Sequence, residues 1–326
     1  MKIIRNLIIF FIFFIMTPTY SNDHYFSIWL KSFKKISLKN GISEKTFDSA
    51  MLNVKFLPKV IEYDRYQPEF YEDTITYITK RTSKKKIEKG INLYLKNKTL
   101  INTIDKKFLV EKELLLALMA IETNFGTYVG KMDILSSLAT LSFDKRRSDF
   151  FTNELITILL LVEKGVIDYK TLYGSWAGAF GNFQFMPSTI KTYAIDYNKD
   201  GKIELKNSLE DSLASAANYI SRIGWKKDQP CFYRVKLTKK IKDKYINSSA
   251  RNISQRLKVT QWKQKGVVSF NDEDLNTNLK AALILPDGKI DTPTYLVFEN
   301  YEKILKWNRS LRFGISVCTL ANMIKT

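Results

Sequence analysis

The sequence predicts a mainly α protein with a small α+β portion toward its C-terminus. Apolar residues recur at helical spacing from residue 24 to about 225, as in "FSIWLKSFKKI" (26–36) and "KELLLALMAIE" (112–122). After Trp225 the chain contains short runs of strand character, such as "CFYRVKL" (231–237). A chain of 326 residues with 45% hydrophobic content can also bury a sizeable core.

Local signals predict where several of these elements begin. Ser43 is expected to cap a helix over 43–51, and Pro68 to open one within 66–79. Residues 83–104 have the pattern of one long basic helix, and 112–122 is apolar on almost every side, as in a central helix. Further helices are expected over 134–143, 149–165 and 310–324, and strands over 231–237, 279–286 and 293–299.

The N-terminus has the features of a secretory signal. Lys2 and Arg5 precede the apolar run "LIIFFIFFIM" (7–16), and small residues follow it, which predicts a signal peptide over 1–21 cleaved after Ser21. The run is too short to span a bilayer comfortably, so an uncleaved anchor is the less favoured alternative. Since no cysteine directly follows the run, a lipid-linked form is not expected.

The net charge of +19 is carried mostly by lysine. Such a surface suits an anionic polymer, although a general lysine bias would produce the same composition. Because the chain is expected to be exported, we predict a partner in the cell envelope and no nucleic acid.

The residue inventory excludes several kinds of chemistry. The only histidine is His24, close to the expected cleavage site, so a Ser-His-Asp or Cys-His system and a histidine zinc site are not expected. Neither a GxxxxGKS/T phosphate loop nor a GxGxxG turn occurs. Cys231 and Cys318 are the only cysteines, and they are compatible with one disulfide or with two buried thiols.

A lone carboxyl group, Glu122, ends the apolar helical run in "ALMAIETNFGTYVG" (117–130). On a helix it lies over Leu118 and Met119, in the last turn, where desolvation and the helix dipole both raise its pKa. A neutral carboxylic acid near physiological pH is what a general acid requires. The alternative is a side chain that points into solvent at a frayed helix end.

The stretch "LYGSWAGAFGNFQFMPSTI" (172–190) is the second candidate. In a helix, Gly174, Gly178 and Gly181 would form a stripe without side chains, for helix packing or for a groove that admits a bulky substrate. The polar residues suited to sugar hydroxyls are Ser175, Asn182 and Gln184. The aromatic residues that either stack on sugars or fill the core are Trp176, Phe180, Phe183 and Phe185.

A third stretch, "DYNKDGKIELKNSLED" (196–211), matches the first half of an EF-hand calcium loop. The matching residues are Asp196, Asn198, Asp200 and Gly201. Its twelfth position is Asn207 in place of a bidentate Glu, so Glu210 or Asp211 would have to close a lengthened loop. We expect a structural Ca²⁺ site, with a plain Asx turn as the alternative.

Six separated stretches together resemble the B-type lytic murein transglycosylases (glycoside hydrolase family 103). The resemblance runs from about residue 24 to the C-terminus. It is carried by "VIEYDRYQPEF" (60–70), "AIETNFGTYVGKMDILSSLATLSFDKRRSDFF" (120–151), "GSWAGAFGNFQFMPST" (174–189), "DYNKDGKIEL" (196–205), "ASAANYI" (214–220) and "ILKWNRS" (304–310).

This resemblance implies cleavage of the β-1,4 bond between N-acetylmuramic acid and N-acetylglucosamine in peptidoglycan. The muramoyl 6-hydroxyl would attack C1 and leave a 1,6-anhydro end, with Glu122 acting first as acid and then as base. One carboxylate suffices because the substrate supplies the nucleophile. The alternatives are a lysozyme-type hydrolase and a non-catalytic peptidoglycan-binding scaffold.

The resemblance also implies the binding residues. Matching positions in the glycan groove are Ser175, Gln184, Tyr219, Trp307, Asn308 and Phe313, with Arg146 and Arg147 near the peptide or glycan. The family commonly has Tyr where this chain has Trp307 and Phe313, so stacking is expected there without the hydroxyl. The implied calcium ligands are Asp196, Asn198 and Asp200, the backbone carbonyl of Lys202, and Glu210 or Asp211.

The implied architecture is a lysozyme-like helical core with an added helical portion and a small C-terminal α+β portion. After the signal (1–21), we expect an N-terminal helical portion (22–110), the catalytic core (111–225) and the α+β portion (226–326). The expected protein is a periplasmic monomer without a stable membrane anchor or organic cofactor. Its partner would be the glycan strands of peptidoglycan.

Overall fold

The structure is a computed structural model that describes residues 19–66, 72–271, 275 and 277–324. The apolar run 7–16 of the expected signal lies outside these residues. Helix α1 (Thr19–Lys39) begins just before the expected cleavage point after Ser21. Within the described part of the chain, no helix has both the length and the apolarity needed to cross a membrane.

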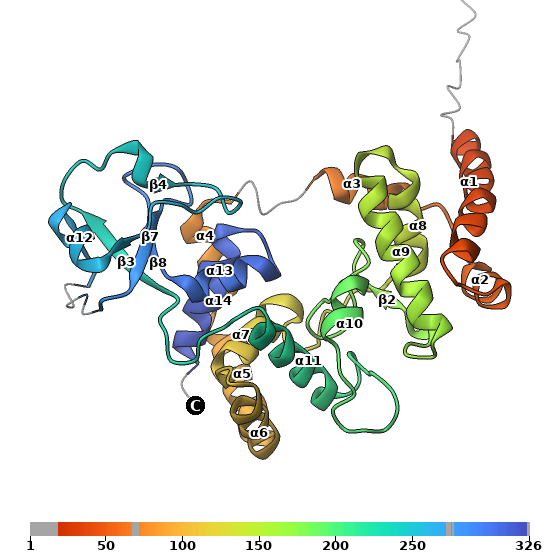
Figure 1. The fold of residues 1–326 in the computed structure, drawn as a ribbon, viewed down its shortest axis with the longest axis horizontal. Coiled ribbons are helices and arrows are strands. Elements are labelled where there is room, and N and C mark those ends of the chain that lie inside the picture. The colour runs from red at the N-terminus through yellow and green to blue at the C-terminus, as the bar shows by residue number, and fades with distance from the viewer. Residues whose placement is uncertain (1–18, 67–71, 272–274, 276, 325–326) are drawn as a thin grey trace, which may run out of the picture.

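Helices form one end and the middle of the molecule, and a small sheet forms the other end (Figure 1). At the helical end, α1 and α2 pack beside α8 and α9. Ser43 caps α2 as predicted, since its side chain accepts a hydrogen bond of 3.2 Å from the Thr46 N–H. The helices of this end are α2 (Glu44–Met51), α3 (Pro58–Arg65), α8 (Ile134–Phe143) and α9 (Ser148–Glu163).

The middle of the molecule is built around α7 (Lys112–Thr123), whose residues from Leu114 to Ala120 are all buried, as its apolar sequence predicts. It packs against helices that precede it and helices that follow it much later in the sequence, because an apolar surface on every side needs several partners. The surrounding helices are α5 (Lys84–Lys96), α6 (Lys98–Phe108), α11 (Leu209–Arg222) and α14 (Leu311–Met323).

Two of the helix predictions were wrong in their bounds. The expected long helix over 83–104 is divided at Asn97, whose φ of −128° and ψ of 30° interrupt the helix while its side chain donates to the Leu93 carbonyl. The helix expected within 66–79 is α4 (Thr74–Arg81), which begins after the N-cap Asp73. Pro68 lies outside the described residues.

The sheet follows Trp225 and contains the three predicted strands. Its order is β4-β7-β8-β3-β6, with β5 paired to β7 beside it. Trp262 of α12 is fully buried against the sheet and donates to the Ala281 carbonyl at 2.9 Å. The elements are β3 (Phe232–Leu237), β4 (Ile246–Asn247), β5 (Leu257–Lys258), α12 (Val259–Gln264), β6 (Val267–Ser269), β7 (Lys280–Ile284), β8 (Thr294–Val297) and α13 (Glu299–Trp307).

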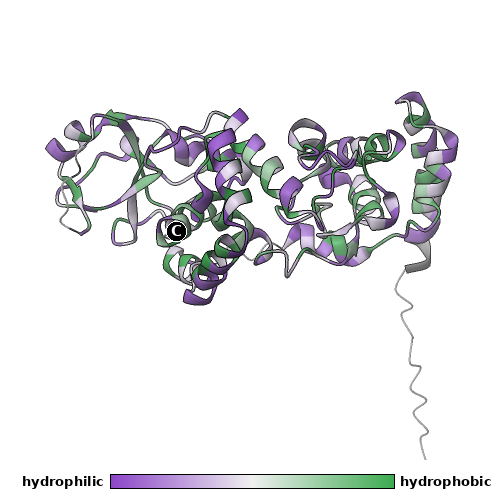
Figure 2. Cartoon of the chain, turned by 90° about the horizontal axis from the view of Figure 1, so that it is seen from below, coloured by the Kyte–Doolittle hydropathy of each residue, from purple (hydrophilic) through white to green (hydrophobic). Residues whose placement is uncertain are grey.

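A disulfide between Cys231 and Cys318 joins the start of β3 to α14. The sequence left this pairing open. Hydrophobic residues gather on the inner sides of the helices and in the sheet, as Figure 2 shows. Val110, at the expected boundary between the first two portions, is fully buried in the main core. The predicted mainly α fold with a small α+β portion is confirmed.

Candidate active site

A sharp turn at the C-terminal end of α7 places Glu122 at the edge of the core. Asn124, Phe125 and Gly126 have φ values of 50°, 59° and 74°, so the chain reverses within three residues. A side chain at Gly126 would meet Asn182 Oδ1 at 2.7 Å, which explains the glycine. The Thr123 hydroxyl donates to the Asn182 carbonyl at 2.7 Å and ties the end of α7 to the glycine-rich stretch.

Glu122 is partly buried and faces the protein. The indole Nε1 of Trp307 donates a hydrogen bond of 2.9 Å to its Oε1. Burial raises the pKa of Glu122 to about 7, and the bond from Trp307 acts in the opposite direction because it favours the anion. The geometry therefore favours the inward, proton-holding carboxyl group over a solvated helix end.

A cavity of about 420 Å³ opens beside Glu122. It lies between the start of α5 and the end of α7. Its lining residues are Ser83, Lys85, Lys86, Ile121, Glu122, Thr123, Asn124 and Tyr128. Glu122 thus borders a space that a ligand can enter.

Aromatic rings hold the Trp307 indole in place. Tyr219 stacks on Trp307 with ring centroids 5.0 Å apart, and Tyr193 stacks on the other side of Tyr219 at 4.3 Å. Phe185 meets the Trp307 ring edge-on at 5.3 Å. The Tyr219 hydroxyl donates to the Lys306 carbonyl at 3.1 Å, and burial raises its pKa to about 12, so it stays protonated. The structure brings the predicted residues Glu122, Tyr219 and Trp307 together.

The glycine-rich stretch is not helical. It contains the short strand β2 (Tyr173–Gly174), which pairs with β1 (Met132–Asp133), and then a loop. Gly178 and Gly181 have φ values of 87° and 77°, and a side chain at Gly181 would meet the Leu205 carbonyl oxygen at 2.5 Å. The glycines therefore serve tight turns and close backbone approach, not a smooth helical stripe.

The polar residues of this loop hold its own backbone. Ser175 Oγ accepts from the Ala179 N–H at 2.9 Å. Gln184 Nε2 donates to the carbonyls of Val129 at 3.1 Å and Gly181 at 2.9 Å. Asn182 is buried, and its amide donates to the Lys206 carbonyl at 3.1 Å and to Ser212 Oγ at 3.0 Å, so it has a structural role.

Burial separates the predicted aromatic residues into two groups. Trp176 is partly exposed and lies 6.4 Å from the Tyr63 ring. Phe313 is only 3% exposed and belongs to the main core, so the expectation that its ring stacks on sugar was wrong. The other rings of the core are Phe180, Phe183 and Phe185. Asn308 is exposed at the end of α13.

Arg146 and Arg147 converge on Asp64, a residue that the sequence analysis did not single out. Arg146 donates from Nε to Asp64 Oδ2 at 2.7 Å and from Nη2 to its carbonyl at 2.6 Å, and Arg147 pairs with Oδ1. The Asp64 side chain is 1% exposed, whereas the arginines are 44% and 37% exposed. The position of Asp64, one turn after the buried Val60 on α3, was the available signal.

The predicted calcium loop is an exposed turn stabilised by its own side chains. Asp196 accepts from the Gly201 N–H at 2.8 Å, and Asn198 donates to Asp200 Oδ2 at 3.0 Å. Gly201 has the positive φ of 88° that the sixth position of such a loop requires. Among the described residues, no three acidic, histidine or cysteine side chains cluster closely enough to hold a metal.

Asp211 closes this loop through hydrogen bonds. It is fully buried and accepts from the N–H groups of Tyr197 at 2.8 Å and Glu204 at 3.0 Å. Both of its oxygens are therefore already engaged. Glu210, in the first turn of α11, is exposed.

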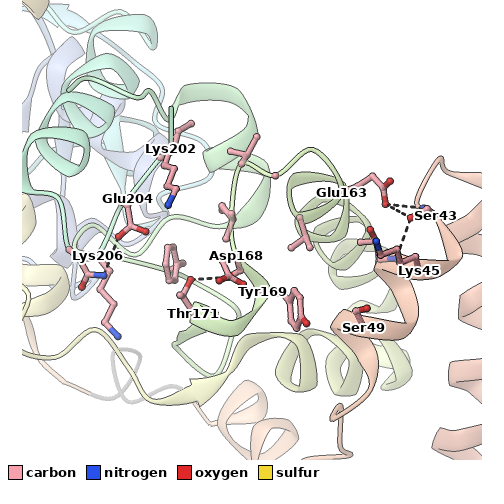
Figure 3. A pocket seen from close by; sticks show the side chains of 18 residues that line it. Ser43, Lys45, Ser49, Glu163, Asp168, Tyr169, Thr171, Lys202, Glu204 and Lys206 are labelled. Carbon is pink, nitrogen blue, oxygen red and sulfur yellow. Dashed lines mark hydrogen bonds between the residues drawn. The ribbon is translucent and has the colours of Figure 1, made fainter. Parts of the chain in front are cut away.

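A larger cavity of about 730 Å³ lies elsewhere, between α2, the end of α9 and the calcium-loop region. Figure 3 shows it, with Glu163 accepting from the Ser43 N–H at 3.0 Å and the Ser43 hydroxyl at 2.9 Å. Of the candidate residues named from the sequence, Phe180 and Lys202 line it, and Glu122 does not. Size alone would thus have pointed away from Glu122.

The fold and the site define a helical protein with one partly buried carboxyl group beside an aromatic cluster. The chain belongs to the transglycosylase SLT domain family, whose model matches residues 25–322. It is 29% identical over 244 residues to the membrane-bound lytic murein transglycosylase B of Escherichia coli K12. That alignment covers 73% of this chain and 63% of the relative, so the chain spans less than two thirds of that relative's length.

Solved structures are similar over nearly the whole chain. SltB3 of Pseudomonas aeruginosa, in complex with NAG-NAM-pentapeptide, is 31% identical with a TM-score of 0.84, covering 92% of this chain and 79% of SltB3. The lytic transglycosylase Slt35 of Escherichia coli, in complex with calcium, is 25% identical with a TM-score of 0.77, covering 94% of each chain. These matches confirm the predicted lysozyme-like fold class.

Proposed function

We propose that this protein is a lytic transglycosylase that cleaves the β-1,4 bond between N-acetylmuramic acid and N-acetylglucosamine in peptidoglycan. The observation that carries the proposal is Glu122, a partly buried carboxyl group with a pKa raised to about 7 at the edge of a cavity. The names of the similar proteins support it, as does the NAG-NAM-pentapeptide bound to SltB3.

In the proposed reaction, Glu122 gives its proton to the glycosidic oxygen as the bond from that oxygen to muramoyl C1 breaks. The muramoyl 6-hydroxyl oxygen then bonds to C1, and its proton passes to the Glu122 carboxylate. Glu122 is thereby restored, no water is consumed, and the product carries a 1,6-anhydro ring. A single carboxyl group is enough for both proton transfers.

The hydrogen bond from Trp307 has a defined part in this sequence. It is strongest when Glu122 is ionised, which is the state after the first proton transfer. Burial works the other way and keeps the resting group protonated. The two effects together set a pKa near neutrality, where a group can both give and take a proton.

The proposed binding surface combines the residues that remain available near this site. Trp307 supplies ring surface, Tyr219 holds it in place by stacking, and the exposed Asn308 supplies an amide. Ser175 and Gln184 shape the loop beside them. Arg146 and Arg147, which keep exposed surface while bound to Asp64, are proposed to approach the peptide or glycan.

Mass spectrometry of muropeptides released from purified sacculi tests the function. We expect 1,6-anhydromuramoyl ends, and Glu122→Gln should reduce their release by at least about a thousandfold while sacculus binding persists. Reducing ends would instead identify a lysozyme-type hydrolase. Binding without any cleavage by the wild-type protein would identify a scaffold.

We also propose a structural calcium site in the loop 196–211. The support is the spacing of Asp196, Asn198 and Asp200, the positive φ of Gly201, and the calcium in the similar Slt35 structure. The Lys202 carbonyl would be a further ligand. Because the oxygens of Asp211 accept backbone N–H groups, Glu210 is the better candidate to complete the site.

Because the proposed substrate is peptidoglycan, we propose a periplasmic location. The protein would be exported and would act as a monomer without a stable membrane anchor.

A further inference from the structure

Two lysines at the start of α5 line the cavity beside Glu122. Lys85 is exposed, whereas Lys86 is partly buried. Lys86 Nζ donates a hydrogen bond of 3.1 Å to the carbonyl of Ala120, two residues before Glu122. This bond joins α5 to the last turn of α7, so Lys86 is fixed close to the proposed catalytic group.

Positive charges surround Lys86, and burial favours the neutral form of Glu122, the carboxyl-bearing residue on the same cavity. Burial lowers the pKa of Lys86, and the nearby cations Arg81 and Lys89 lower it further. Arg81 pairs with Glu72, and Lys84 with Glu88, whereas no carboxylate pairs with Lys85 or Lys86 among the residues that the structure describes. A partly desolvated cation in this position favours the arrival of an anion.

The bond to Ala120 explains only part of this arrangement. A cation at the C-terminal end of α7 is favourable because the helix dipole is negative there. However, an ammonium group has three N–H donors, and the contact with Ala120 uses one of them. The helix end also does not explain the second lysine on the same cavity.

Further donors border the same space. Ser83 is the N-cap of α5, but its hydroxyl makes no capping hydrogen bond. Tyr128, in the segment that follows α7, is 72% exposed and also lines the cavity. Two cations and two hydroxyls around one open volume suit a carboxylate on a flexible ligand.

In peptide-bearing peptidoglycan the muramoyl lactyl group is tied up as an amide, so the sugars are neutral and the acidic groups belong to the stem peptide. That residue also contains the C1 at which the proposed reaction occurs, so its peptide must lie near Glu122. Resting on the proposed function, we propose that this cavity binds a stem-peptide carboxylate through Lys86 and Lys85. Lys86 is then a specificity residue for peptide-bearing strands.

Paired substrates test this proposal. Initial rates are measured on peptide-bearing glycan strands and on denuded strands, from which an amidase has removed the peptides and in which the exposed lactyl carboxylates have been converted to neutral amides. Lys86→Met should lower kcat/KM about tenfold on peptide-bearing strands and leave denuded strands within about twofold. The lost bond to Ala120 affects both substrates alike, whereas the lost bond to the peptide carboxylate affects only the first. Lys86→Arg should retain most of the activity on both.

Lys84→Met is the matched control, because Lys84 is a neighbour on α5 whose side chain is 91% exposed and does not line the cavity. It should change neither rate. An equal loss on both substrates in Lys86→Met would overturn the proposal and make Lys86 a support of α7. An unchanged rate on peptide-bearing strands would overturn it as well.

Binding measurements separate this proposal from the proposed reaction. In a Glu122→Gln background, calorimetry compares a disaccharide-peptide with the corresponding peptide-free disaccharide whose lactyl group is a neutral amide. Lys86→Met should weaken binding of the first about tenfold and leave the second unchanged. If the wild-type protein cleaves no glycan but Lys86→Met weakens only the binding of the disaccharide-peptide, the proposed reaction is wrong and the peptide site stands. If the wild-type protein cleaves glycan but Lys86→Met affects both ligands equally or neither, the peptide site is wrong and the reaction stands.

Discussion

Trp307 Nε1 lies 2.9 Å from Glu122 Oε1, and this hydrogen bond joins residues separated by 185 positions in the sequence. It connects the end of α13 to the end of α7. The tertiary packing of these two helices thus places a neutral donor beside the one carboxyl group of the proposed site.

Trp307→Phe should raise the pKa of Glu122 above about 7, because the indole bond favours the ionised form. The ring itself and its stacking on Tyr219 are largely kept. We expect the alkaline limb of the pH–rate profile to move to higher pH, and kcat near neutrality to fall about tenfold. Trp176→Phe is the control, and an unmoved alkaline limb in Trp307→Phe would contradict the assigned role.

Glu122→Gln should stabilise the protein at high pH. The folded-state pKa of about 7 exceeds the ordinary value of 4.5, so the folded state binds the extra proton between these values. Stability from this group is complete below pH 4.5 and is lost as the pH rises to about 7, by roughly 3 kcal/mol. In urea unfolding, Glu122→Gln should have a higher free energy of unfolding than the wild-type protein at pH 8 but not at pH 4.

A pH-independent difference between these two proteins would show that Glu122 is not desolvated in the folded state. Wild-type activity should follow the same titration. Because the first step needs the proton, we expect the rate to fall as the pH rises through about 7.

Asp64→Ala should cost about 3 kcal/mol of unfolding free energy, since it leaves Arg146 and Arg147 without the buried carboxylate on which they converge. Chemical denaturation measures this change. Asp48 is an ion-pair partner of Lys34, and its side chain is 56% exposed. Asp48→Ala should therefore cost less than about 1 kcal/mol of unfolding free energy. Equal effects of the two substitutions would mean that the Asp64 pair is solvated.

Calcium should raise the Tm of the wild-type protein, because a ligand that binds only the folded state stabilises it. Asp200→Ala and Glu210→Ala should each lose most of this response. Glu210→Ala should keep the calcium-free Tm, whereas Asp200→Ala should lower it slightly because Asp200 accepts hydrogen bonds within the exposed loop. Asp211→Ala should lower the Tm even without calcium, because it removes acceptors for Tyr197 and Glu204. A full calcium response in Asp200→Ala would exclude this loop as the site.

Local patterns in the sequence were sufficient for most of the helices and strands. Ser43 caps α2, and the three predicted strands form the centre of the sheet. The errors arose where local preference competes with other contacts. Asn97 ends one helix and precedes another, and Gly178 and Gly181 adopt positive φ in a loop where a helix would have needed φ below zero.

The candidate site was predictable to the extent that it depends on residue types. A chain without a usable histidine, with one carboxyl group in the last turn of an apolar helix, already pointed to Glu122. The clamp of Asp64 by two arginines, the burial of Phe313 and the position of Lys86 were not predictable. Each depends on which faces of two helices or strands pack together, and the local spacing of residues does not determine this.

The sequence by itself determined the helical character, the strands, and the chemistry available to the protein, because these follow from side-chain periodicity and residue types. Only the tertiary structure decided that Cys231 pairs with Cys318, that Trp307 donates to Glu122, and that burial raises the pKa of Glu122 to about 7. Pairing and desolvation are properties of neighbours in space, and these neighbours are brought together only when the helices pack.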